Sequence, residues 1–125
     1  MAAISTKNYY MTKKQIVERY LDGFRTGEQA KILSCLADKI VWRLHGCQTF
    51  IGKEAFEANI TNEEFREIPI FEVRELIEEG NIVVAVGSGA LNDSTENSRK
   101  FVFTEVFLFE ANQVIEVDTF HIWTD

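Results

Sequence analysis

Proline, cysteine and histidine are scarce in this sequence, and their scarcity excludes several kinds of site. The chain of 125 residues contains one proline, two cysteines and two histidines. It has no Cys-x-x-Cys or His-x-x-x-His pair and no glycine-rich phosphate loop, so neither a zinc site nor a nucleotide site is predicted. Cys35 and Cys47 are expected to be reduced thiols, because no secretion signal precedes them. We expect no metal and no cofactor.

Long apolar runs and an excess of basic charge are also absent. No apolar segment approaches the ~20 residues that span a membrane. Residues 1–15 lack the apolar centre of a signal peptide. The expected location is therefore the cytoplasm, away from membranes. The formal net charge of −7 repels phosphate backbones, which argues against general binding to nucleic acids.

The chain instead has a large apolar fraction, 46% of its residues with ten phenylalanines, which is typical of an ordered globular protein. One domain, 12–125, is predicted to follow an irregular leader, 1–11. A capping box of Thr12 and Gln15 predicts where the first helix begins, and Gly27 predicts where it ends.

Hydrophobic periodicity predicts the remaining elements. Further helices are expected at about 28–37 and 53–60, with a loop at 47–52 between them. Strands are expected at 40–45, 70–78, 82–91, 100–109 and 114–123. Helices gathered in front of antiparallel strands predict an α+β fold, in which one curved sheet wraps over a helix layer.

Residues 101–109 form the most informative predicted strand. Side chains alternate between the two faces of a strand, so the odd positions share one face. These positions are Phe101, Phe103, Glu105, Phe107 and Phe109. A carboxylate among four phenylalanines must be paired, hydrogen-bonded or protonated. Glu105 is therefore the first candidate for chemistry.

The last two strands are predicted to form a hairpin around residues 111–112. If Phe109 lies opposite Val114, then Glu105 faces Asp118 on the same aromatic wall. Two carboxylates so close do not both ionise in an apolar setting, so one pKa is expected to rise. A slip of one residue would move Asp118 to the other face.

The reverse face of this hairpin is also largely apolar. One helix layer covers only one face, so we expect a homodimer through this outer face. The predicted interface residues are Val102, Thr104, Val106, Val117, Thr119, His121 and Trp123.

A second strand is predicted to contribute to the cavity. Trp42 and Leu44 share a strand face with Ile40, and as wall residues they favour an apolar or aromatic ligand. The predicted ligand-binding set is completed by six phenylalanines: Phe24, Phe56, Phe101, Phe103, Phe107 and Phe120.

Short motifs along the chain carry a resemblance to a known family. They are Glu18-Arg19-Tyr20-Leu21, Gly27-Glu28, Ile32 to Leu36 followed by Ala37-Asp38, Val41-Trp42 and Gly52-Lys53-Glu54-Ala55. In outline, residues 12–123 resemble the nuclear transport factor two-like superfamily, in its SnoaL-like and ketosteroid isomerase-like branch. The resemblance implies a cone-shaped, strongly bent antiparallel sheet around three helices, with a pocket at the wide end. It also implies a dimer through the outer sheet face.

Matched residue by residue, the resemblance to ketosteroid isomerase is partial. Tyr20 matches the tyrosine that donates to the developing oxyanion, and Glu105 matches the protonated aspartate beside it. The general-base aspartate corresponds to Leu44, which argues against steroid isomerisation by that route. SnoaL-like cyclases and related epoxide hydrolases use carboxylates of the last strands, where Asp118 lies. If the loop at His45 folds over the mouth, His45 is the best replacement for the missing base.

Three functions remain open from the sequence. The leading hypothesis is a pocket for a small hydrophobic or aromatic carbonyl compound, with cofactor-free proton transfer of the isomerase, cyclase or dehydratase type. Tyr20 and Glu105 would polarise an oxygen, while Asp118 or His45 would accept a proton. The alternatives are a non-catalytic ligand-binding or dimerisation module, which Leu44 supports, and an adaptor for a protein partner.

Overall fold

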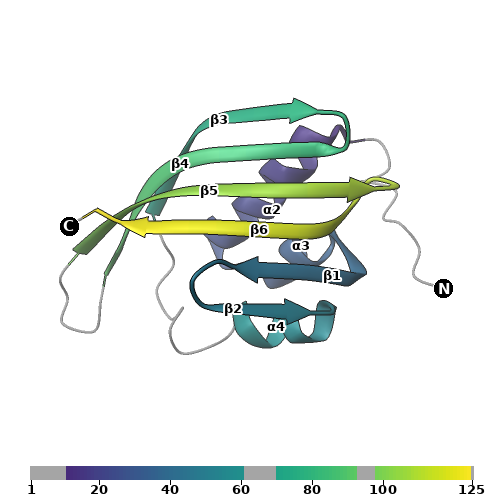
Figure 1. Ribbon diagram of the computed structural model, residues 1–125, viewed down its shortest axis with the longest axis horizontal. Coiled ribbons are helices and arrows are strands. Elements are labelled where there is room, and N and C mark those ends of the chain that lie inside the picture. Colours follow the sequence, from purple (N-terminus) through teal and green to yellow (C-terminus); the bar gives the residue numbers. More distant parts are fainter. Residues whose placement is uncertain (1–10, 61–69, 93–97, 125) are drawn as a thin grey trace.

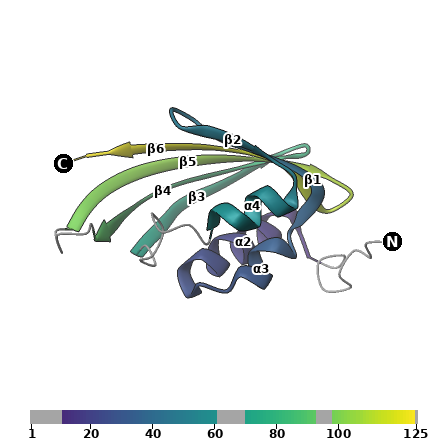
Figure 2. The same cartoon turned by 90° about the horizontal axis from the view of Figure 1, so that it is seen from below.

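Six strands form one sheet that bends over a layer of helices (Figure 1, Figure 2). The computed structural model describes residues 11–60, 70–92 and 98–124. The strand order is β2-β1-β6-β5-β4-β3. Neighbouring strands are antiparallel except β1 and β6, which are parallel. The predicted α+β class, with helices ahead of a curved sheet, is confirmed.

The helices and strands have the following bounds. The described helices are α2 (Lys13–Thr26), α3 (Gln29–Leu33) and α4 (Lys53–Ile60), and all lie on the concave side of the sheet (Figure 2). The strands are β1 (Leu36–Leu44), β2 (Gln48–Ile51), β3 (Ile70–Glu79), β4 (Ile82–Asn92), β5 (Ser98–Glu110) and β6 (Gln113–Trp123). None of the described helices is long and apolar enough to cross a membrane. The predicted leader, 1–11, lies outside the described residues except for Met11.

The predicted ends of α2 are confirmed. The backbone N–H of Gln15 donates to Oγ1 of Thr12 at 3.1 Å, and the backbone N–H of Thr12 donates to Oε1 of Gln15 at 2.9 Å. This reciprocal capping box satisfies two donors that a helix start would otherwise leave unpaired. Gly27 ends the helix with a φ of 72°, a left-handed conformation that glycine adopts without a steric penalty.

Two predicted elements near residue 40 are wrong in extent. The predicted helix 28–37 is shorter, because Leu36 already pairs with Val114 of the sheet. The predicted loop 47–52 contains the edge strand β2. There Phe50 pairs with Trp42, and the ring centroids lie 5.1 Å apart. The sequence of β2, Gln-Thr-Phe-Ile, does not alternate between polar and apolar side chains, so the pattern does not reveal this strand.

The predicted register of the last hairpin is correct only at its turn. Phe109 pairs with Val114 as predicted, but Leu108 then pairs with Glu116, so Ile115 is an extra residue on β6. Such a β-bulge shifts every later pair by one position. Glu105 therefore faces Thr119 instead of Asp118.

The bulge also exchanges the two faces of β6. Phe120 and Asp118 lie on the outer, convex face, whereas the predicted interface residues Val117, Thr119, His121 and Trp123 lie on the inner face. This face assignment follows because directly paired residues share a face, and these four pair with phenylalanines of β5 or with Glu105. The homodimer itself stays a prediction. The outer face carries exposed apolar residues that suit it, including Ile122, Val102 and Phe120, which are 61%, 43% and 40% exposed.

The core lies between the concave face and α2, and two glycines of β4 shape its edge. Gly87 pairs with Phe103, and Gly89 pairs with Phe101. A Cβ at Gly87 would lie 2.8 Å from the Phe103 ring, and a Cβ at Gly89 would lie 2.6 Å from the Phe101 ring. Both aromatic rings therefore rest directly on bare backbone, which fixes where the aromatic wall of the site stands.

We expect Gly87→Ala to destabilise the protein by about 1–3 kcal/mol, the usual cost of overpacking. The added methyl group would also lie 2.1 Å from the carbonyl oxygen of Glu72, a backbone atom that cannot move away easily. The midpoint of urea unfolding measures the effect. Ser88→Ala, at the exposed neighbouring position, is the matched control and is expected to stay within about 0.5 kcal/mol of wild type. Equal midpoints for the two variants would contradict this account of the wall.

Candidate active site

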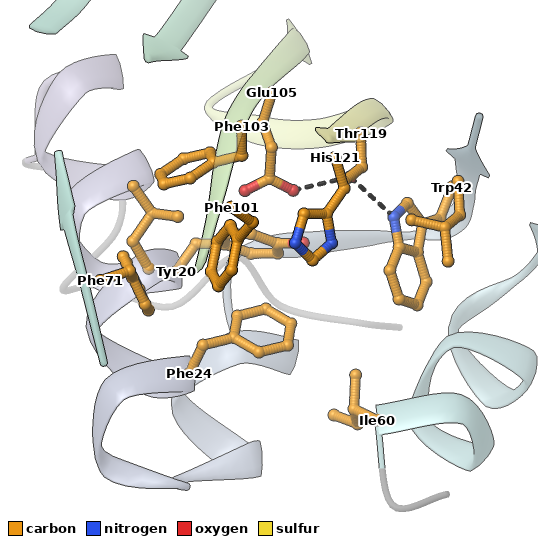
Figure 3. A pocket seen from close by; sticks show the side chains of 12 residues that line it. Tyr20, Phe24, Trp42, Ile60, Phe71, Phe101, Phe103, Glu105, Thr119 and His121 are labelled. Carbon is orange, nitrogen blue, oxygen red and sulfur yellow. Dashed lines mark hydrogen bonds between the residues drawn. The ribbon is translucent and has the colours of Figure 1, made fainter. Parts of the chain in front are cut away.

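A cavity of about 170 Å³ lies between α2 and the concave face of the sheet (Figure 3). Its wall is mostly apolar: Leu21 and Phe24 of α2, Trp42 and Leu44 of β1, Ile60 of α4, Phe71 of β3, and Phe101 and Phe103 of β5. Four polar side chains complete the lining: Tyr20, Glu105, Thr119 and His121. An apolar chamber with a few convergent polar groups is typical of a small-molecule site.

A hydrogen-bond chain crosses three strands on one side of the cavity (Figure 3). The indole N–H of Trp42 donates to Oγ1 of Thr119 at 3.0 Å. The hydroxyl of Thr119 donates to Oε2 of Glu105 at 2.7 Å. The indole nitrogen can only donate, so Oγ1 of Thr119 accepts in the first bond and its own hydrogen is free to be donated to Glu105.

Burial raises the pKa of Glu105 from 4.5 to about 7, and the hydrogen bond from Thr119 opposes the rise. The apolar surroundings disfavour the charged carboxylate, as expected from the sequence. Oε2 accepts the hydrogen bond from Thr119, so Oε1 is the carboxyl oxygen left for another partner. That oxygen points away from Thr119 (Figure 3). In its neutral form Glu105 can therefore also act as a hydrogen-bond donor.

Tyr20 brings a second donor to the same cavity. Its side chain is 1% exposed, and its ring makes edge contacts with Phe24 and Phe107 at centroid distances of 5.1 Å. Within the described part of the chain its hydroxyl has no hydrogen-bond partner. Burial, and next the negative charge of Glu105, raise the pKa of Tyr20 well above its ordinary value. The hydroxyl therefore keeps its proton.

His121 is the third titratable group that lines the cavity. Its ring lies edge-on to Phe101 at a centroid distance of 4.2 Å and lies 4.8 Å from the Trp123 ring. The residue is exposed on its other side, so it stands at the opening. Desolvation by the neighbouring rings lowers the pKa of His121, which favours the neutral imidazole.

The structure brings together only part of the predicted site. Tyr20 and Glu105 line the cavity, as do five predicted ligand-binding residues: Phe24, Trp42, Leu44, Phe101 and Phe103. Phe56 and Phe107 are instead fully buried in the core. The catalytic roles of Tyr20 and Glu105, and the ligand-binding roles of the phenylalanines, Trp42 and Leu44, stay predictions.

Two predicted catalytic residues lie on the outer face, away from the cavity. Asp118 follows the bulge and sits beside Arg43, with Oδ2 3.4 Å from the guanidinium. Nε2 of His45 lies 2.8 Å from Oδ1 of Asp118, and the His45 ring stacks on Phe120 at 4.3 Å. The placement of Asp118, His45 and Phe120 at the cavity was therefore wrong.

Sequence reasoning missed five lining residues: Leu21, Ile60, Phe71, Thr119 and His121. Thr119 and His121 were assigned to the outer face because the bulge at Ile115 was not anticipated. Both faces of β6 contain apolar residues, so alternation alone did not identify the inner one. Among the described residues, no group of three histidine, cysteine, aspartate or glutamate side chains could hold a metal ion.

The fold is that of solved NTF2-like proteins, and the family follows from the sequence match. A profile of the SnoaL-like domain matches residues 17–117, so the chain belongs to the SnoaL-like family. No curated protein gives a significant match to the sequence.

Solved structures share the fold at low sequence identity. An NTF2-like protein of unknown function from Burkholderia pseudomallei K96243 is 20% identical, with a TM-score of 0.82, over 88% of this chain and 91% of that one. TerC, co-crystallised with polyporic acid, is 16% identical, with a TM-score of 0.78, over 86% and 89%. An LEH-like epoxide hydrolase from M. tuberculosis is 15% identical, with a TM-score of 0.77, over 87% and 81%.

We expect Thr119→Val to raise the pKa of Glu105 further above 7, because the variant removes the hydrogen bond that favours the anion. The valine has a similar shape but cannot accept from Trp42 or donate to Glu105. An NMR titration of ¹³C-labelled glutamate carboxyl groups measures this pKa. Thr119→Ser keeps the hydroxyl group and should therefore give the wild-type value. Thr104→Val, on the outer face of β5, is the control and should leave the Glu105 titration unchanged. A lower pKa in Thr119→Val would contradict the assigned direction of the chain.

Proposed function

We propose that the cavity binds a small hydrophobic or aromatic molecule with a carbonyl oxygen and catalyses cofactor-free proton transfer on it. The reaction is of the isomerase, cyclase or dehydratase type. The observation that carries the proposal is the buried Tyr20 hydroxyl without a hydrogen-bond partner among the described residues. It lines the same cavity as Glu105, whose carboxyl proton is retained to about pH 7.

A carbonyl oxygen is the acceptor that these two donors lack. A buried hydroxyl without a partner costs about 1–3 kcal/mol, and a bound acceptor would recover that cost. Two donors on one oxygen also stabilise the negative charge that develops there when a proton leaves the adjacent carbon. The pair therefore favours the transition state of enolisation over the bound ketone.

The size and lining of the cavity support a ligand of one or two rings. An engineered apolar cavity of about 150 Å³ binds benzene, and the cavity here has about 170 Å³. Aromatic walls from Phe101, Phe103 and Trp42 suit a flat, apolar body. Glu105 and Tyr20 are the buried groups of the lining that can donate to an oxygen, so the carbonyl group is expected to point toward them.

Two structural neighbours agree with a small-molecule role by analogy of fold. TerC was crystallised with polyporic acid, and the protein from M. tuberculosis is an epoxide hydrolase. Both share the fold of this chain at TM-scores above 0.7.

A matched pair of ligands tests the carbonyl preference. We expect 2-tetralone, a two-ring ketone, to bind more tightly than tetralin, which has the same rings and no oxygen. Tyr20→Phe should reduce this preference by about threefold to tenfold, the usual value of one hydrogen bond. The unfolding free energy of the free variant should be equal to or higher than that of wild type, because the change removes an unpaired buried hydroxyl. Calorimetric titration measures both affinities.

The polarisation of the bound carbonyl group gives an independent check on the affinity measurement. The ¹³C signal of labelled 2-tetralone should move downfield on binding to wild type and move less in Tyr20→Phe. Glu105→Gln keeps a donor and should retain binding, whereas Glu105→Ala should lose part of the downfield shift. Equal affinities for both ligands in wild type would overturn the proposed function.

The raised pKa of Glu105 also predicts how the stability of the protein depends on pH. The folded protein keeps this proton up to about pH 7, whereas the ordinary pKa of 4.5 applies to the unfolded chain. Between these values the folded state binds more protons, so the free energy of unfolding should fall as pH rises. Glu105→Gln should lose this component, so the difference between variant and wild type should grow in favour of the variant from pH 4.5 to 7. Urea unfolding at the two pH values measures this difference. If the variant and wild type differ in unfolding free energy by the same amount at both, the Glu105 carboxyl titrates as it does in water and the prediction is wrong.

A further inference from the structure

We propose that His121 is the proton acceptor of this cavity. It would take a proton from the carbon next to the ligand's carbonyl group while Glu105 donates to the carbonyl oxygen. The inference rests on the proposed function and names the base that the sequence left open. His121 lies on β6 at the opening of the cavity. It would act as the general base, a role that the apolar side chain of Leu44 cannot perform.

The register places His121 and Glu105 as diagonal neighbours on one face. Glu105 pairs with Thr119, and His121 pairs with Phe103, so the two groups are offset by two residues across β5 and β6. Diagonal neighbours lie about 7–8 Å apart, with their Cβ atoms somewhat closer. In Figure 3 the imidazole lies below the Glu105 carboxyl group. This span leaves room for a ligand whose acidic carbon is two bonds from its oxygen.

The protonation states of the lining residues also point to His121 as the group that can accept a proton. Among the described residues that line the cavity, three are titratable: Tyr20, Glu105 and His121. The first two hold their protons in the neutral pocket, as the raised pKa values of both show. Asp118 and His45 are on the opposite face of the sheet. The neutral imidazole is therefore the one titratable lining group that is ready to accept.

Burial reverses the usual order of the acid and the base. In water a glutamic acid gives its proton to histidine, and the two form an ion pair. Here burial raises the pKa of Glu105 to about 7, and desolvation lowers the pKa of His121. The neutral acid and the neutral base therefore coexist in the ground state, as general acid–base catalysis requires. The charged group beside the Trp123 ring, which lies 4.8 Å from the His121 ring, is the Arg99 guanidinium, 4.1 Å from the Trp123 centroid.

The proposed step balances without a further reactant. A ring nitrogen of His121 forms a bond to the hydrogen, and the electron pair of the broken C–H bond becomes the C=C bond of an enol. The carbonyl π pair moves to oxygen, which takes the Glu105 proton. In the return step the imidazolium protonates a carbon of the enol, and the hydroxyl proton returns to Glu105. The exposed side of His121 lets the imidazolium exchange its proton with water.

Deuterium exchange of 2-tetralone in D₂O tests the proposal. We expect wild type to accelerate loss of the benzylic hydrogens next to the carbonyl, followed by ¹H NMR. His121→Gln should slow the catalysed rate by at least about 100-fold, the lower end of general-base contributions. Binding of 2-tetralone and its ¹³C carbonyl shift should remain, because Tyr20 and Glu105 are intact. The pH profile should be bell-shaped, and the variant should lose its acidic limb.

The chain offers a matched control, since it contains two histidines. His45→Gln removes the outer-face imidazole and should leave the exchange rate unchanged. Exchange that persists in His121→Gln overturns the assignment of His121 and leaves the proposed function standing. If wild type binds and polarises 2-tetralone but exchanges nothing, both the base and the catalytic part of the function fail, and a ligand-binding module remains. If 2-tetralone is not preferred over tetralin, the proposed function itself fails.

Discussion

The chain of two hydrogen bonds from Trp42 through Thr119 to Glu105 is the constraint on which the site depends. It links β1, β6 and β5, which are neighbours in the sheet. Indole can only donate, so Thr119 accepts from Trp42 and has its own hydrogen to donate to Oε2 of Glu105. The two bonds fix the position of the Glu105 carboxyl group in the cavity wall and leave its Oε1 without a bond from Thr119.

One inserted residue decides which side chains meet in the cavity. Ile115 bulges out of the β5–β6 ladder and changes the register between the turn and Glu105. Without that insertion, Asp118 would stand beside Glu105 on the aromatic wall. With it, a threonine replaces the second carboxylate, and the like-charge repulsion expected from sequence is replaced by a hydrogen bond. The raised pKa of Glu105 consequently has burial as its cause.

The sequence predicted what depends on local chemistry and failed where the cause is non-local. The capping box at Thr12 and the end of α2 at Gly27 follow from the conformational preferences of those residues. Glu105 was found because a carboxyl group within an apolar pattern is visible in the sequence alone, whereas Tyr20 was found through the resemblance to ketosteroid isomerase. The bulge was not visible, since both faces of β6 are apolar and either register buries such residues. Thr119 and His121 were consequently assigned to the wrong side.

Two glycines of β4 influence the shape of the cavity although they do not line it. The rings of Phe101 and Phe103 rest on Gly89 and Gly87, and both rings form part of the lining. A methyl group beneath either ring would lift it toward the space that a bound molecule needs. A side chain at either glycine would therefore narrow the cavity while the acid and the hydroxyl stay intact. The width of the cavity is set by residues behind its aromatic wall that do not themselves line it.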